Sequence, residues 1–322
     1  MKKGILCFAG LLIYIRVFCW GFYMHEQINY HAVFLLPPQM MILYKQNIGF
    51  LTEHAVDPDK RRYVAASEGA HHFMDIDHYG ISPFRDLPRS YKAAVDKFSA
   101  DTLQAYGIVP WWIQTMLNRL TKAFREKDCR LILKYSAEIG HYIADAHVPL
   151  HACSNHNGQF TNQLGIHAFW ESRIPELFAA KEWDFFIGKA VYIPDPGAFI
   201  WARLLESAAA ADTVLRCERE ANAHIRTDQK YAFEERKGML VRQYSTAYAR
   251  LYNEKLNDMV ERRMRQSIFA VASFWYTAWV NAGQPSLDRL AHDSLTLAEQ
   301  HEYKILNLEW KKGKVIGWDC DQ

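Results

Sequence analysis

One stretch of the sequence decides its interpretation: HYIADAHVPLH, residues 141–151. His141 and Asp145 are four residues apart, so a helix places both side chains on the same face. Pro149 cannot continue such a helix, and the turn that follows lets His151 face back toward the same point. The stretch therefore predicts a helix that ends in a cluster of imidazole and carboxylate groups.

The helix that leads into this stretch has two distinct faces, each with helical spacing. One is apolar and aromatic and consists of Leu131, Tyr135, Ile139 and Tyr142. The other is polar and consists of Lys134, Glu138, His141 and Asp145. The first face can pack in a core while the second meets a polar interior.

Histidine is concentrated just beyond this helix. The chain has 14 histidines in 322 residues, and residues 141–171 alone hold five of them. His167 and Glu171 repeat the spacing of four, so they too share a helix face. A single pair of this kind is usually a surface interaction worth about 0.5 kcal/mol. Two pairs with His151 between them favour a metal site instead, because zinc prefers imidazole and carboxylate ligands.

Two upstream segments offer further ligands. Asp57 precedes Pro58 in a pattern that is also typical of a helix start, with Asp57 as the N-cap. His72 lies in a run rich in histidine and aspartate, residues 71–78. His25 and His31 are six residues apart, not four, so the HExxH motif of zinc proteases is absent there.

The N-terminus has the pattern of a secretory signal peptide. Two lysines precede a short apolar run at residues 4–15, and Trp20 follows the expected cleavage point. We therefore expect a signal peptide at residues 1–19, export of the protein, and a mature chain of residues 20–322. A buried N-terminal helix or an uncleaved anchor is the alternative.

The remaining sequence predicts an all-α fold, a single helical domain without repeats or a long linker. Residues 240–282 fit one long helix or two in succession, and residues 204–237 fit a polar helical pair. Beyond about residue 175 the sequence suggests only generic helices. The net charge of +2 gives no general attraction for nucleic acid or anionic membranes. The four cysteines outside the signal peptide show no disulfide framework.

These segments, in this order, resemble the family of zinc-dependent phospholipases C and S1/P1-type nucleases. The family pattern is a Trp near a His, an Asp, His-[Phe/Tyr]-x-Asp, His-x3-Asp-x5-His, and His-x3-[Asp/Glu]. The matching residues here are Trp20, His25, Asp57, His72, Asp75, His141, Asp145, His151, His167 and Glu171. The resemblance spans residues 20–175 and implies an all-helical fold around a multinuclear site of three zinc ions.

The resemblance also implies which residues bind each ion. The first ion would be held by Asp57, His72, His141 and Asp145. The second would be held by His151, His167 and Glu171. The third would be held by the α-amino group and carbonyl of Trp20, by His25 and by Asp145, which bridges to the first. Asp57 would also orient or deprotonate the attacking water, although Asp59 is an alternative at this position.

The implied activity is hydrolysis of a phosphodiester by zinc-activated water. The short gap from His151 to His167 favours a phospholipase C-like enzyme, whereas the five-residue step from Trp20 to His25 favours a single-strand nuclease. Phe73, Phe160 and Trp170 are possible stacking surfaces for nucleic acid bases. A non-catalytic exported binding protein with structural zinc is a further alternative. No stable protein partner is implied.

Overall fold

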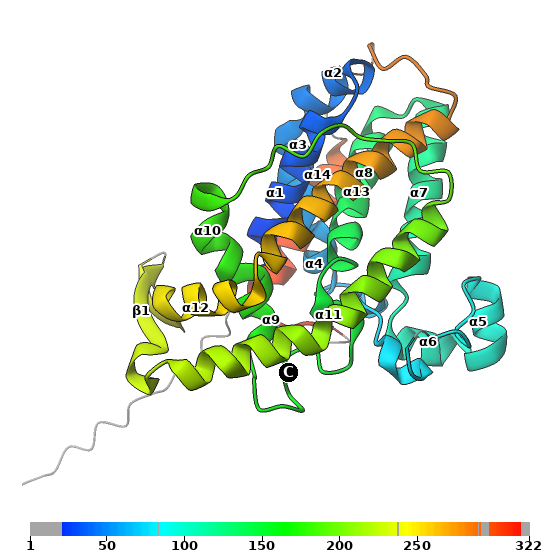
Figure 1. The fold of residues 1–322 in the computed structure, drawn as a ribbon. Helices are drawn as coiled ribbons and strands as arrows, with labels where there is room; N and C mark the ends of the chain where they lie inside the picture. Colours follow the sequence, from blue (N-terminus) through cyan, green and yellow to red (C-terminus); the bar gives the residue numbers. More distant parts are fainter. Residues whose placement is uncertain (1–20, 83, 237, 289, 291–295, 317–322) are drawn as a thin grey trace, which may run out of the picture.

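The computed structural model describes residues 21–82, 84–236, 238–288, 290 and 296–316. In these ranges the chain is predominantly helical, and its strands form one hairpin (Figure 1). The all-α prediction is confirmed. The α-helices are α1 (Phe22–Ala32), α2 (Pro38–Gln46), α3 (Ile48–Glu53), α4 (Asp57–Arg61), α5 (Tyr91–Phe98), α6 (Ala100–Tyr106), α7 (Val109–Glu126), α8 (Cys129–Asp145), α9 (Ile166–Ala168), α10 (Ile174–Glu182), α11 (Pro196–His224), α12 (Thr246–Leu256), α13 (Met259–Asn281) and α14 (Leu297–Lys312).

Short turns and the hairpin complete the described elements. The 3-10 turns are η1 (Val33–Leu35), η2 (His54–Val56), η3 (Gly69–His71), η4 (Ile76–Tyr79), η5 (Pro149–Ala152) and η7 (Thr227–Gln229). A π-helical turn forms η6 (Phe169–Arg173), and the antiparallel hairpin pairs β1 (Tyr231–Arg236) with β2 (Met239–Tyr244).

Helix α8 lies in the middle of the helical body, where it packs against α1, α7 and α13. Its first turn is capped by Asp128, whose side chain accepts a hydrogen bond of 3.1 Å from the Leu131 amide. From Ser136 to Asp145 every residue of α8 is buried. The polar residues in this half of the helix must therefore find their partners inside the protein.

Helices α1 and α8 approach each other closely at Gly140. The side chain of Asn29 on α1 donates a hydrogen bond of 3.0 Å to the carbonyl of Ala137. A Cβ atom at Gly140 would lie only 2.0 Å from the Asn29 Oδ1 atom. This approach brings His25, one turn before Asn29, against His141, with a ring-centroid distance of 3.9 Å.

The second half of the chain departs from the sequence prediction. In place of a polar helical pair, residues 196–224 form one long helix, α11, and the β1–β2 hairpin follows. Residue 240, the predicted start of the next helix, lies in β2, and that region forms α12 and α13. The hairpin is held by Arg173, which donates to the Tyr244 carbonyl at 3.0 Å and binds Glu234. These contacts are distant in sequence, so local periodicity did not reveal them.

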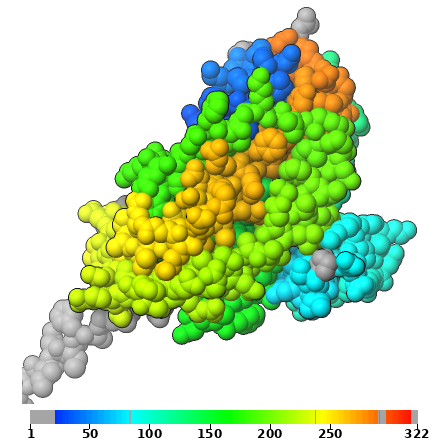
Figure 2. All heavy atoms as spheres, viewed as in Figure 1, coloured from blue at the N-terminus to red at the C-terminus, as the bar shows by residue number. Residues whose placement is uncertain are grey.

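Figure 2 shows α11, α12 and α13 forming much of one face of the molecule, while the segment that contains α5 and α6 projects from the body. Helix α14 packs on α4. There the Tyr303 ring lies 4.1 Å from the His54 ring, and the Ile316 amide donates to the Arg62 carbonyl at 2.9 Å. None of the described helices combines the length and the apolar character that a membrane span requires.

Candidate metal centre

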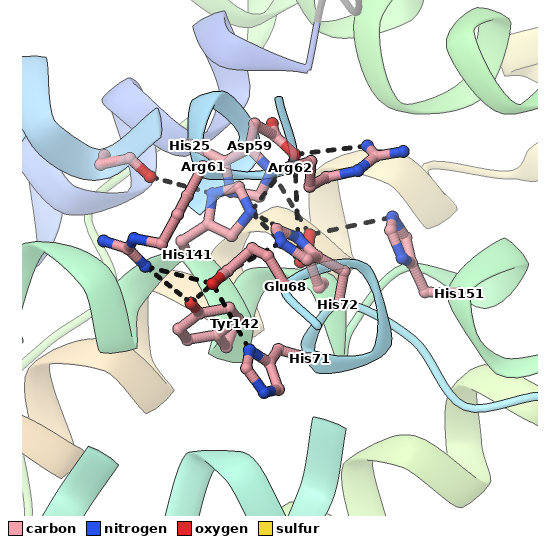
Figure 3. Close-up of polar contacts among 12 residues, drawn as sticks. His25, Asp59, Arg61, Arg62, Glu68, His71, His72, His141, Tyr142 and His151 are labelled. Atoms are coloured by element: carbon pink, nitrogen blue, oxygen red, sulfur yellow. Dashed lines mark hydrogen bonds and ion pairs between the residues drawn. The ribbon is translucent and has the colours of Figure 1, made fainter. Parts of the chain in front are cut away.

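The first cluster of candidate ligands consists of Asp59, His72 and His141, whose ligand atoms lie within 4.8 Å of one another. Asp59 comes from α4, His72 follows η3 directly, and His141 comes from α8 (Figure 3). His141 Nε2 lies 3.0 Å from His72 Nδ1 and 3.7 Å from Asp59 Oδ1. All three side chains are buried. Two ring nitrogens this close need a proton or a cation between them.

A hydrogen bond on the far side of the His141 ring determines which nitrogen faces the cluster. Nδ1 lies 2.9 Å from the carbonyl oxygen of Ala55. A carbonyl only accepts, so Nδ1 carries the hydrogen and the Nε2 atom of the neutral ring carries a lone pair. This is the arrangement of a metal-binding histidine, whose other nitrogen is usually bonded to a carbonyl or a carboxylate.

Of the two aspartates that the sequence left open, Asp59 reaches this cluster, and Asp57 has other partners. The carboxylate of Asp57 is occupied by Lys60 Nζ at 3.0 Å and His54 Nδ1 at 2.5 Å. Burial opposes the charge of Asp57, but these two partners outweigh it and lower its pKa. Residues two apart in a helix do not share a face, so α4 can direct only one of the two aspartates to the cluster.

Asp145 connects the first cluster to the other candidate ligands. Its Oδ2 atom lies 3.0 Å from His72 Nδ1 and 3.3 Å from His141 Nε2. Its Oδ1 atom lies 3.4 Å from His25 Nε2 and 3.8 Å from His151 Nε2. The two oxygens thus face different groups of histidines, which is the geometry of a bridging carboxylate.

The second cluster consists of His151, His167 and Glu171, which lie in η5, α9 and η6. His167 Nε2 lies 3.2 Å from His151 Nε2 and 3.1 Å from Glu171 Oε2. His167 Nδ1 lies 3.1 Å from the carbonyl oxygen of His156, so Nε2 is again the free lone pair of the neutral ring. Glu171 lies in a π-helical turn, a feature that is frequent at functional sites.

A third group combines His25 with His141 and Asp145. Next to it, a Cβ atom at Gly21 would lie 2.8 Å from Glu171 Oε1, so the backbone at residue 21 adjoins the second cluster. The predicted ligand Trp20 and the predicted signal peptide at residues 1–19 lie outside the described residues.

The protein groups alone, without an ion, favour a proton on His72 but not on His25. Burial and the neighbouring His141 lower the pKa of His25 to about 4. Burial also disfavours a charged His72, but Asp145 and Glu68 outweigh it and raise the pKa of His72 to about 9. Asp145 and Glu68 therefore hold a proton on the buried His72 ring. A metal cation at this place would neutralise the same negative charges.

The two central carboxylates are ionised despite complete burial. Burial acts to raise the pKa of Asp145, but His141 and His151 outweigh it and hold this pKa well below its usual range. Burial also acts to raise the pKa of Glu171, but His167 and His151 outweigh it. The pKa of Glu171 is therefore likewise far below its usual range. Ionised, buried carboxylates among histidines whose ring nitrogens point toward them fit a divalent cation.

A buried network behind His72 was not anticipated from the sequence. Glu68 Oε1 lies 3.5 Å from His72 Nε2, and Glu68 also accepts a hydrogen bond from the Tyr142 hydroxyl. Arg61 contacts Glu68 and Tyr142 (Figure 3). It also pairs with the buried Glu138. The sequence feature that could have predicted this contact is the spacing of four residues between Glu68 and His72. The network supports the ring of one expected ligand.

Six other histidines had no place in the expected ligand pattern: His31, His54, His71, His78, His147 and His156. In the part of the chain that the structure describes, none belongs to the three candidate groups. His54 instead binds Asp57, and the His71 ring stacks on Trp112 at 3.7 Å. His54 and His71 thus contact neighbouring side chains that are not candidate ligands.

Comparison with known proteins agrees with this geometry. The model of the family described as "Zinc dependent phospholipase C" matches residues 24–273. That range contains all three candidate groups and most of the helical body. A search of the curated proteins found no match. The chain belongs to the zinc-dependent phospholipase C family, whose members hydrolyse phosphate esters.

Proposed function

We propose that the protein is an exported phosphodiesterase of phospholipase C-like specificity that uses about three zinc ions. One observation carries the proposal. The second cluster offers three protein ligands, and a catalytic zinc site keeps a further position open for water. The first cluster, by contrast, has the three ligands of its group and also Asp145. The second cluster would therefore hold a reactive zinc ion with an open position, and the first cluster would hold an ion with four protein ligands.

The chain's own residues would position the reaction. Zinc, when bound, would supply Lewis-acid activation of water and neutralise charge at the phosphoryl oxygens. Asp145 would fix the spacing of the two clusters through its two oxygens. Asp59 would take the water-orienting role first expected of Asp57. The buried guanidinium of Arg62 lies 3.7 Å from Asp59 Oδ1 and adds a positive charge beside the first cluster (Figure 3).

The exposed side chains support a lipid rather than a nucleic acid as substrate. Two of the three expected stacking surfaces, Phe73 and Trp170, are each only 1% exposed and belong to the interior. Phe160 is 72% exposed and Leu164 is 63% exposed, on the segment between His151 and His167. Two exposed apolar side chains on the segment that joins two ligands of the second cluster suit contact with a lipid surface. A single-strand nuclease would instead use Phe160 alone for stacking.

The proposals of a third zinc ion and of export both depend on cleavage of the predicted signal peptide, residues 1–19. Signal-peptide cleavage before Trp20 would create a free α-amino group, and His25 and Asp145 would complete its site. No protein partner is needed for any step.

The test is hydrolysis of phosphatidylcholine and of single-stranded DNA by the purified, exported protein, with and without a chelator. We expect phosphatidylcholine to be cleaved, the activity to disappear with the chelator, and zinc to restore it. Cleavage of DNA alone would replace the phospholipase proposal with the nuclease. A protein that binds about one zinc ion and cleaves neither substrate would be a binding protein with structural zinc.

A further inference from the structure

The carboxylate of Glu68 is a costly group to bury at its position. Glu68 is 3% exposed, and it lies among the ionisable groups of Arg61, His71, His72 and Tyr142. Buried ion pairs often contribute less to folding than apolar residues of the same size, because both charges lose their hydration. A gain in stability therefore does not explain why Glu68 is buried here. Its contact with the candidate ligand His72 suggests a role at the metal centre instead.

The two nitrogens of His72 have different surroundings. Nδ1 faces the first cluster, 3.0 Å from both Asp145 Oδ2 and His141 Nε2. Nε2 points away from the cluster toward Glu68 Oε1 at 3.5 Å. A movement of about 0.5 Å would close this contact to an ordinary hydrogen bond. A carboxylate in this position favours the ring form with hydrogen on Nε2 and a lone pair on Nδ1.

Glu68 itself is held from the other side. Arg61 Nη1 lies 3.4 Å from Glu68 Oε2, and the Tyr142 hydroxyl donates to Oε1. Tyr142 belongs to α8, the helix that also carries His141. Its hydroxyl therefore fixes the Glu68 carboxylate relative to that helix directly, without Glu138.

We propose that Glu68 is a positioning residue that holds the His72 ring with Nδ1 toward the metal centre by accepting the hydrogen of Nε2. The inference rests on the proposed zinc enzyme and adds a residue that the expected ligand pattern does not contain. Partners of this kind orient the ligand and increase its basicity, and their loss typically weakens metal binding by about 10- to 100-fold.

The chain offers a matched control in Glu138. It is a buried carboxylate of the same network, 6% exposed and paired with Arg61. It makes no described contact with His72. The variants Glu68→Gln and Glu138→Gln each remove one buried negative charge beside Arg61. They should therefore disturb the fold similarly, but only Glu68→Gln should disturb His72.

The experiment measures zinc affinity by competition with a chromophoric chelator for the wild type and both variants. It also records the ring ¹⁵N and Nε2–H signals of His72 in the zinc-loaded proteins. We expect Glu68→Gln to bind zinc about 10- to 100-fold more weakly, with an upfield shift of the Nε2–H signal. Glu138→Gln should keep its zinc affinity within about twofold of the wild type and leave this signal in place.

The possible failures are distinct. A wild-type protein that binds no zinc would defeat the proposed function itself. If the wild type binds zinc and Glu68→Gln binds it equally well, or leaves the His72 signal unmoved, Glu68 does not position the ring. Equal losses of zinc affinity in both variants would assign the effect to the fold and also overturn the inference.

Discussion

The two main clusters use similar ligands but are supported in different ways. In the first cluster, His141 is fixed by a backbone carbonyl, and a buried carboxylate approaches the outer nitrogen of His72. In the second, His167 is fixed by the His156 carbonyl. His151 Nδ1, like His72 Nε2, is buried without a hydrogen-bond partner, but among the described contacts no carboxylate approaches it. The first cluster lies against α8, and the second lies in short helical turns. The two clusters thus differ more in the groups that hold their ligands in place than in the ligands themselves.

This difference suggests a division of roles. A firmly supported set of ligands binds its ion tightly and contributes to the fold, since metal affinity in the folded state adds to stability. A less supported set with an open position can exchange water and substrate. We therefore expect the first cluster to contribute mainly to structure and the second mainly to reactivity.

The largest expected effect comes from removing the residue that both clusters share. Asp145→Asn keeps the size of the side chain but removes the charge that faces His72 and His141 on one side and His25 and His151 on the other. We expect complete loss of hydrolysis and of most bound zinc, measured by turnover and elemental analysis. Full zinc content in this variant would show that the clusters do not depend on a common bridge.

Gradual chelation should separate the two clusters. The second cluster, with His151, His167 and Glu171 as its ligands, should lose its ion first. Activity should then disappear while the helical circular dichroism signal is still intact, and helicity should fall only as the remaining zinc is removed. If activity and helicity decline together, the division of roles is wrong.

Acid should destabilise the protein in a defined range. Burial, with help from neighbouring cations, lowers the pKa of His25 and of His156 to about 4 and that of His147 to about 3. In the unfolded chain these pKa values are about 6.5. Below about pH 6.5 the unfolded chain therefore binds more protons, and the free energy of unfolding falls as the pH is lowered.

In the metal-free protein His72 acts in the opposite sense. Its pKa of about 9 gives a stabilisation that is present below pH 6.5 and lost as the pH rises through 9. Bound zinc displaces this proton, so added zinc should move the acid transition to lower pH. Circular dichroism titrations with and without zinc measure the shift, and an unmoved transition would contradict a histidine metal centre.

The smallest expected effect concerns the crossing of α1 and α8. Gly140→Ala would place a methyl group 2.0 Å from Asn29 Oδ1, so the helices must separate slightly. We expect a loss of about 1–3 kcal/mol in the free energy of unfolding, with weakened zinc binding at His25. Gly49→Ala is the control, because it is also helical but has nothing within 4 Å of the added atom. That variant should be neutral or stabilised by up to about 1 kcal/mol in urea titrations.

Helical spacing predicted the all-α fold class, but not the arrangement of the second half of the chain. The pairs His141 with Asp145 and His167 with Glu171 follow from helical spacing, and the structure brings each pair together. Their assignment as zinc ligands remains a prediction. The choice between Asp57 and Asp59 depended on the direction of α4 and on the partners of Asp57, which spacing does not reveal.

The features that were missed depend on contacts between distant residues. The β1–β2 hairpin is held by Arg173, which lies 61 residues before Glu234 and 71 residues before Tyr244 in the chain. The Glu68 network is completed by Glu138, seventy-seven residues from Arg61. Local periodicity correctly indicated helices, but it contains no information about which distant charges meet.

Helix α14 has a consequence for the order in which the protein is made. The family match ends at residue 273, yet the ring of Trp310 lies 5.3 Å from that of Phe22, and Tyr303 covers His54 beside α4. A ribosome synthesises the segments of His25 and Asp59 early and their covering helix late. Helix α14 therefore cannot pack on α4 and on Phe22 at the start of α1 until about residue 316 has emerged, after the segments that carry His25 and Asp59 have been made.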